Sequence, residues 1–248
     1  MSKSLEERLR ELAASADSVF LSPITVSRLR EQGIEIPQQR QLTPNEAADV
    51  LFADQRKAQA VRMLEQLPER PDIPVSSIQS LYSEIRAAIA LGVYGAAITL
   101  SGILVEYTLK YAAYKIEMGG FANYDAEKWD EFERLDFSAA IARANKNRLL
   151  TRDARKSLNE FRAQFRNPYN HYNIRKITSN YLQQPLTILN TRENKVKAQD
   201  VAAKDNPIVQ AAAKPLADAD NVLPVYAFAD SVVKYLWIKI KDLPTLPK

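Results

Sequence analysis

The sequence contains no cysteine, and it has only one histidine and 6 glycines among its 248 residues. Without cysteine, the chain has no disulfide, no thiolate nucleophile and no cysteine-ligated zinc, a composition that fits a reducing compartment. One histidine also excludes a histidine-rich metal site within one chain. A carboxylate cluster is the remaining option for a metal, but the acidic segment 125–136 has no ligand spacing. We therefore expect neither a metal nor another cofactor.

Long hydrophobic runs are also missing. The longest, residues 93–105, is interrupted by polar residues and followed by Glu106, so it is too short for a membrane span. Residues 1–20 alternate in charge and lack the apolar stretch of a secretory signal. The formal net charge is only +4, which does not by itself select a nucleic-acid partner. We expect a soluble, cytoplasmic protein.

Helical periodicity dominates the chain, whereas strand-like alternation bounded by turn residues is hard to find. The sequence therefore predicts an all-α fold. Residues 93–118 are apolar almost all round, which favours a central position in a helical bundle, and Gly119 and Gly120 should end this helix. Another helix is expected to begin near Leu5. The remaining expected helices cover about 43–67, 76–91, 137–144, 151–167 and 222–240.

A proline-rich stretch divides this helical pattern. Residues 68–74, PERPDIP, contain three prolines that no helix can cross. We therefore expect a helical N-terminal extension over residues 1–70 and a helical domain over 75–248. Within that domain, residues 190–220 are polar, rich in Ala and Lys and poorly patterned, which predicts an extended or mobile insertion.

The single histidine stands in the segment RNPYNH, between Arg166 and Tyr172. In an uninterrupted helix, residues five positions apart point roughly 140° away from each other. Pro168 disfavours helical geometry at Asn167, so we expect the helix carrying Arg166 to bend or end there. Arg166 and His171 could then reach one cleft, or each could face its counterpart across a dimer axis.

This pair of side chains suits metal-free cleavage of RNA. The guanidinium of Arg166 can bind phosphate in a bidentate manner, and histidine, here His171, is the side chain most often used as a general acid or base. The imidazole could deprotonate a ribose 2′-OH or protonate the leaving oxygen, so a homodimer would supply both a base and an acid. The spacing also arises by chance, and the alternative interpretation is a structural histidine.

The segment resembles the Arg-X4-6-His motif of HEPN domains, the higher eukaryotes and prokaryotes nucleotide-binding superfamily, many members of which are ribonucleases. Residues 76–175 are similar to the family's helical order, and the last helix extends this similarity. The resemblance implies a HEPN-like bundle and a metal-independent endoribonuclease in which Arg166 and His171 are catalytic and Asn167 has a positioning role. It also implies a homodimeric toxin or antiviral defence effector that is restrained by an antitoxin or another partner.

Further residues near the motif are candidates for support and for RNA binding. A carboxylate in a hydrophobic helix is costly unless it is paired, so Glu106 either orients Arg166 or His171 or forms a salt bridge at the helix edge. Tyr169, Asn170 and Tyr172 could contact an unpaired base, and Arg162 could contact the RNA backbone. For the tyrosines and Asn170 the alternative is packing, and for Arg162 it is a solvated helix face.

At the level of the whole protein, the alternative is a non-catalytic HEPN-like binding or assembly subunit of a larger defence or nucleic-acid-processing complex.

Overall fold

The computed structural model divides the chain into two compact units, residues 1–50 and 51–248. It describes only parts of the second unit, namely residues 54–181, 185–190, 195–202 and 205–244. The helix expected near Leu5, the first part of the helix expected over 43–67 and most of the proposed extension lie outside the described residues.

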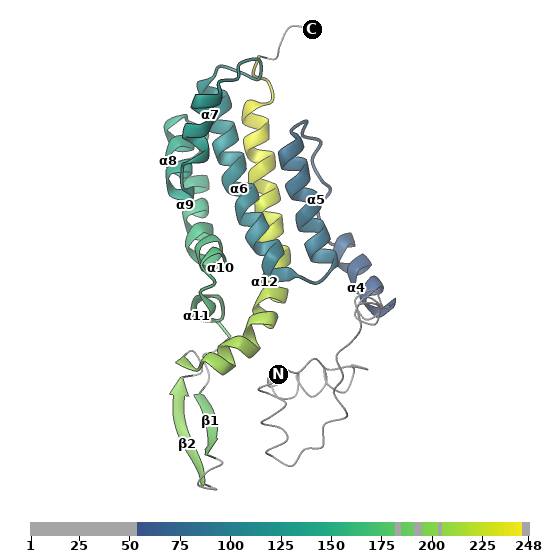
Figure 1. Cartoon of the computed structure of the whole chain (residues 1–248), viewed down its shortest axis with the longest axis vertical. Coiled ribbons are helices and arrows are strands. Elements are labelled where there is room, and N and C mark those ends of the chain that lie inside the picture. Colours follow the sequence, from purple (N-terminus) through teal and green to yellow (C-terminus); the bar gives the residue numbers. More distant parts are fainter. Residues whose placement is uncertain (1–53, 182–184, 191–194, 203–204, 245–248) are drawn as a thin grey trace. The chain divides into compact units, whose positions relative to one another are not determined.

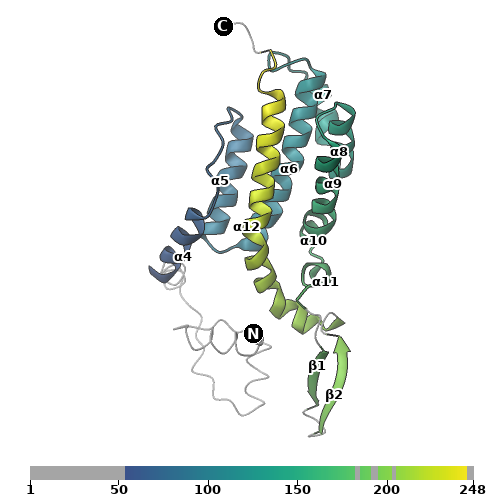
Figure 2. The ribbon, with the colours of Figure 1, turned by 180° about the vertical axis from the view of Figure 1, so that it is seen from behind.

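A long central helix organises the described bundle. Helix α6, Tyr94–Glu117, lies between α5, Ser76–Ala90, and α8, Phe137–Lys146, while α12, Pro207–Ile240, packs along it (Figures 1 and 2). Residues buried on α6 lie on several sides of the helix, as its apolar composition predicts. The helix ends at two glycines with positive φ, Gly119 at 71° and Gly120 at 137°, which confirms the expected stop. The prediction of an all-α fold is confirmed for this bundle.

The remaining helices cover the ends and one side of the bundle. They are α4 (Asp54–Glu65), α7 (Ala126–Glu133), α9 (Arg152–Phe161), α10 (Asn167–Asn170) and α11 (Ile174–Ile177). Asp125, Asp136 and Thr151 accept hydrogen bonds from backbone N–H groups and thereby cap α7, α8 and α9. Among the described helices, none has both the length and the apolar composition needed to cross a membrane.

The expected domain boundary at residues 68–74 lies inside the second compact unit. Leu67, directly before this stretch, and Ile73, within it, are buried in the same hydrophobic core as Ile78 of α5. The prolines therefore break the helix between α4 and α5, as expected, without separating two units there. Helix α4 packs against α5 as part of the bundle.

The prediction of an extended insertion over residues 190–220 is wrong for its second half. Asn206 caps α12, Pro207 occupies its first turn, and the helix continues to Ile240. Two prolines inside this helix, Pro215 and Pro224, account for its visible bend (Figures 1 and 2). The small residues Ala213 and Ala217 form the buried strip here, so the segment lacks the large apolar side chains that mark a helix in a sequence.

The first half of that segment contributes to a hairpin. Strand β1, Pro185–Asn190, pairs antiparallel with β2, Lys195–Ala202, and the register shifts between Leu186 and Ile188. These two strands form the only sheet among the described residues. They were not expected from the sequence, because their residues do not alternate cleanly between polar and apolar side chains.

Candidate active site

The motif lies on a helix that changes its winding. Helix α9 passes directly into a π-helical turn, Arg162–Arg166, in which the N–H of Asn167 donates to the carbonyl of Arg162, five residues earlier. Helix α10 then continues to Asn170. The expectation that the helix bends or ends at Asn167 is therefore wrong in position, because regular α-helix resumes there.

The π-turn explains how the helix tolerates Pro168. A proline inside an α-helix lacks an N–H donor, and its ring meets the carbonyl four residues earlier. The wider π-turn, which ends two residues before Pro168, changes the hydrogen-bond pattern at this point, so the ring is accommodated and is buried. Turns of this kind are rare and frequently mark functional sites.

The helix ends with a tightly bonded cap. The N–H of Asn173 donates to the carbonyl of Pro168 at 2.7 Å, and the N–H of Tyr172 donates to that of Tyr169 at 3.2 Å. These are the two hydrogen bonds of a Schellman motif, whose left-handed position usually holds glycine. Tyr172 occupies that position with φ 49°, a strained conformation for a large side chain. His171, immediately before it, is the last residue before the chain turns.

Arg166 is held against the central helix by Glu106. Its Nη2 and Nε atoms lie 2.8 Å and 3.2 Å from the same carboxylate oxygen, Oε2, while Lys110 lies 3.0 Å from Oε1. The side chains of Arg166 and Glu106 are 19% and 14% exposed. Glu106 thus forms a salt bridge and, through it, orients Arg166. Both roles expected for Glu106, the salt bridge and the orientation of a motif residue, are combined in this contact.

Three further contacts shape the position of Arg166. A Cβ at Gly102 of α6 would lie only 3.3 Å from the Cγ of Arg166, so the missing side chain lets the arginine approach the helix closely. The guanidinium carbon lies 5.9 Å from the centre of the Phe137 ring. Asn167 accepts a longer hydrogen bond of 3.4 Å from Nη1 of Arg166. Asn167 therefore contacts the arginine, as a positioning residue would.

His171 is placed differently. Its side chain is exposed, and its imidazole makes no hydrogen bond or ion pair with a described residue. The backbone N–H of His171 donates to the carbonyl of Asn167 at 3.1 Å. One chain thus holds Arg166 firmly against α6 and presents His171 to solvent at the helix end.

The four residues expected to bind substrate differ in their burial. Tyr169 is buried, and its hydroxyl donates to Asp218 at 2.8 Å; burial, followed by this hydrogen bond, raises the pKa of the tyrosine. Asn170 and Tyr172 are exposed. The Nε atom of Arg162 is buried without a hydrogen-bond partner among the described residues. Tyr169 is therefore a packing residue with a polar end, and the other three remain accessible in whole or in part.

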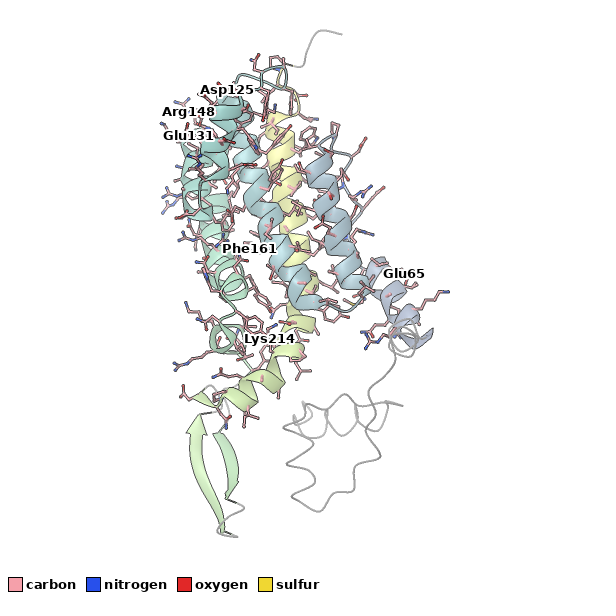
Figure 3. All side chains as sticks on the ribbon, in the orientation of Figure 1. Glu65, Asp125, Glu131, Arg148, Phe161 and Lys214 are labelled. Carbon is pink, nitrogen blue, oxygen red and sulfur yellow. The ribbon has the colours of Figure 1, made fainter. Side chains whose placement is uncertain are left out.

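A cavity of about 890 Å³ lies beside the motif, and Tyr169 and Tyr172 line it, whereas Arg166 and His171 do not. Lys214 and Asp218 of α12 also line it (Lys214 is labelled in Figure 3), and the sequence predicts neither as a site residue. Their i,i+4 spacing indicates an ion pair only on a helix, and the sequence predicts an extended insertion here. The same spacing between Glu106 and Lys110 could have identified Lys110.

Comparison of the chain with models of protein families, with curated proteins and with solved structures gives no significant match. In the part of the chain that the structure describes, no three carboxylate or imidazole side chains are grouped so that they could hold a metal ion. Support for a candidate site therefore comes from the structure alone. This support concerns the motif helix, which consists of α9, the π-turn and α10, and the elements packed against it.

Proposed function

We propose that the protein is a metal-independent endoribonuclease that acts as a homodimer, with Arg166 and His171 as catalytic residues. The observation that supports this proposal is the contrast between the two side chains. His171, the only histidine, is exposed and has no described partner, so its nitrogens are accessible to a substrate. Arg166, on the same helix, is held in one orientation by Glu106.

The remaining donors of Arg166 suit a phosphate group. A guanidinium has five N–H donors, and the hydrogen bonds to Glu106 and Asn167 use three of them. The others are available for oxygens of the phosphate, whose negative charge increases as the phosphorus becomes five-coordinate. A side chain that is already oriented loses little conformational freedom when it binds.

The proposed reaction needs two histidines. Neutral His171 of one copy accepts the proton of a ribose 2′-OH, and the 2′-oxygen attacks the adjacent phosphorus. The bond to the 5′-oxygen then breaks, and this oxygen takes a proton from the protonated His171 of the second copy. The products are a 2′,3′-cyclic phosphate and a 5′-hydroxyl. With one imidazole per chain, a dimer is the simplest source of both groups.

The biological setting is proposed from the HEPN resemblance alone. The resemblance supports a toxin or phage-defence effector that cuts RNA when an antitoxin or another partner protein releases it. Control by a partner is compatible with His171 on the surface, where a bound protein could cover it.

The proposed function is tested by incubating purified full-length protein with mixed RNA, including tRNA, in EDTA. We expect cleavage by the wild type, and loss of about 10²- to 10⁴-fold in rate for His171→Ala, as for the removal of a general acid or base. Arg134→Ala serves as a control for Arg166→Ala, because Arg134 is exposed and has no described partner. Circular dichroism checks the folding of each variant. Equal cleavage by the wild type and the folded His171→Ala variant would rule out the catalytic role.

Two observations favour the alternative, a non-catalytic binding or assembly subunit. Glu106 already neutralises Arg166, and neither Arg166 nor His171 lines the cavity beside the motif. If light scattering shows a monomer and no RNA is cut with or without a candidate partner, the binding function is the better proposal.

A further inference from the structure

The cavity beside the motif has apolar walls and a polar floor. Its walls come from the start of α6, the first half of α12 and the end of the motif helix, including Val93, Ala96, Leu100, Ala211 and Pro215. Val93 is 52% exposed, so part of the apolar wall is accessible from solvent. Mostly apolar walls with a few convergent polar groups are typical of sites for small organic groups.

An ion pair forms the polar floor. Lys214 lies 2.6 Å from Oδ2 of Asp218, and Oδ1 of Asp218 accepts the hydroxyl hydrogen bond of Tyr169. The lysine and aspartate side chains are only 13% and 12% exposed. A Cβ at Gly95 would lie 2.9 Å from Asp218 and 3.1 Å from Lys214, so the glycine makes room for the pair. Removing two charges from water is costly, and an apolar pair would fill this space at less cost.

Tyr172 forms the rim of the cavity. It is 64% exposed, and the ammonium of Lys214 lies 5.3 Å from the centre of its ring. The ring therefore has one side toward Lys214, while its large exposed fraction leaves aromatic surface accessible. The left-handed backbone of Tyr172, fixed by the cap hydrogen bonds, holds the ring beside the cavity. Glycine would form this cap without strain, so the tyrosine carries a conformational cost that its side chain must offset.

We propose that this cavity binds one unstacked nucleobase of the RNA next to the cleaved bond. This inference depends on the proposed ribonuclease function, since it names the part of the substrate that lies beside His171. A base can stack on the exposed surface of Tyr172 and against the apolar wall. The edge of a base carries adjacent donors and acceptors, and Lys214 and Asp218 offer a matching donor and acceptor at the floor.

The position of Tyr172 in the sequence links the cavity to the reaction. Tyr172 directly follows His171, and both belong to the same cap, so a base held by Tyr172 places its own ribose or a neighbouring ribose near the imidazole. The pocket would thereby align the RNA, while Arg166 and His171 carry out the chemistry. Tyr172, Lys214 and Asp218 are positioning and specificity residues in this proposal.

The test uses full-length protein and a single-stranded RNA oligonucleotide with 2′-O-methyl riboses, which cannot be cleaved by 2′-OH attack. One base is replaced by 2-aminopurine, whose fluorescence falls when it stacks on an aromatic ring. We expect quenching by the wild type, and for Tyr172→Gly we expect loss of quenching and affinity weaker by about 5- to 150-fold. Glycine suits the left-handed position, so this variant should remain folded.

Tyr124→Ala is the matched control, because Tyr124 is also a highly exposed tyrosine, at 69%, and does not line the cavity. It should bind and quench like the wild type. A second variant, Asp218→Asn, replaces an acceptor at the floor and should change which of four oligonucleotides, differing at one base, binds most tightly. Failure of the wild type to bind any of them, or unchanged binding by Tyr172→Gly, would overturn the pocket.

The two proposals can fail separately. Oligonucleotide binding that depends on Tyr172, without cleavage of ordinary RNA, supports the base pocket and removes the nuclease function. Cleavage that depends on His171, with an unchanged KM in Tyr172→Gly, supports the nuclease and overturns the pocket.

Discussion

Two glutamates of α6 hold two arginines from neighbouring segments, and the two ion pairs use their hydrogen bonds differently. At Glu117, Nε and Nη2 of Arg143 bind separate carboxylate oxygens at 2.5 Å and 2.6 Å, and Asn147 adds a hydrogen bond of 2.8 Å. At Glu106, about three turns away, both donors of Arg166 bind one oxygen. The first pair has the parallel two-bond geometry that makes such pairs strong, whereas the second does not.

The two regions are otherwise built alike. The guanidinium of Arg143 lies 5.0 Å from the centre of the Phe132 ring, much as that of Arg166 lies near Phe137. Helix α8 also ends in a Schellman motif with a residue other than glycine in the left-handed position, Arg148 at φ 57°. The two arginines differ in the number of carboxylates near them. Arg143 is additionally close to Glu131, at 3.5 Å, while no second carboxylate is found near Arg166 among the described residues.

We infer that the Glu117 pair mainly fixes α8 against α6 and that the Glu106 pair mainly orients an arginine for a ligand. The largest expected difference is in RNA cleavage. Arg166→Lys keeps the charge but removes the planar fork, so we expect about a 10²-fold loss of cleavage rate, comparable to the loss of one transition-state donor. Arg143→Lys should cut RNA at the wild-type rate. Rates on one oligonucleotide under single-turnover conditions provide the measurement, and equal losses in both variants would contradict the distinction.

The second expected difference is in stability and has the opposite order. Arg143→Met should lower the free energy of unfolding by about 1–2 kcal/mol, because it leaves Glu117 without its two charged hydrogen bonds at a site that is only partly exposed. Arg166→Met should cost less, since Lys110 still pairs with Glu106 at 3.0 Å, whereas the lysine that remains near Glu117, Lys128, is 4.0 Å away. Urea unfolding followed by circular dichroism measures both values. A larger cost for Arg166→Met would show that the motif arginine is mainly structural.

The fold was largely predictable where large apolar side chains repeat with helical periodicity. Residues 93–118 were expected as a central helix because apolar residues occur all round it, and α6 confirms this. The first half of α12 was missed because Ala213 and Ala217 pack there through small side chains, and two prolines interrupt the pattern. A strip of alanines has little hydrophobic signal in a sequence, although it permits close helix packing.

The candidate site was predictable in residue type but not in arrangement. A carboxylate in a hydrophobic helix needs a partner, which identifies Glu106 from the sequence, and its partners in the structure are Arg166 and Lys110. The π-turn before Pro168 was not predictable, because local propensities contain no specific signal for it. The expected bend at Asn167 allowed Arg166 and His171 either to reach one cleft or to face their counterparts across a dimer axis. The structure separates a held arginine from an exposed histidine within one chain.

A smaller effect concerns acid unfolding. The Arg143 guanidinium, with help from Asn147, holds the pKa of the Glu117 carboxyl below its usual range. The stabilisation from ionised Glu117 is therefore present above the ordinary glutamate pKa of about 4.3 and is lost as pH falls through the lower pKa of the folded state. Glu117→Gln should flatten the loss of stability below about pH 4.3. Glu65→Gln, at an exposed residue without a described partner, should not.

The smallest expected effect concerns the stability gained when glycine replaces the left-handed residue at each of the two helix ends, Tyr172 and Arg148. Glycine adopts positive φ at little cost, so Tyr172→Gly and Arg148→Gly should each raise the free energy of unfolding by about 0.5–1 kcal/mol. The gain should be smaller for Tyr172, because its ring also contacts Lys214. If the strain at Tyr172 is retained for RNA binding, its relief should come with weaker binding of the oligonucleotide, whereas Arg148→Gly should gain stability without losing base stacking. Thermal unfolding and 2-aminopurine quenching on the same two variants measure both quantities, and equal quenching by both would leave the strained tyrosine with no role beyond ending the helix.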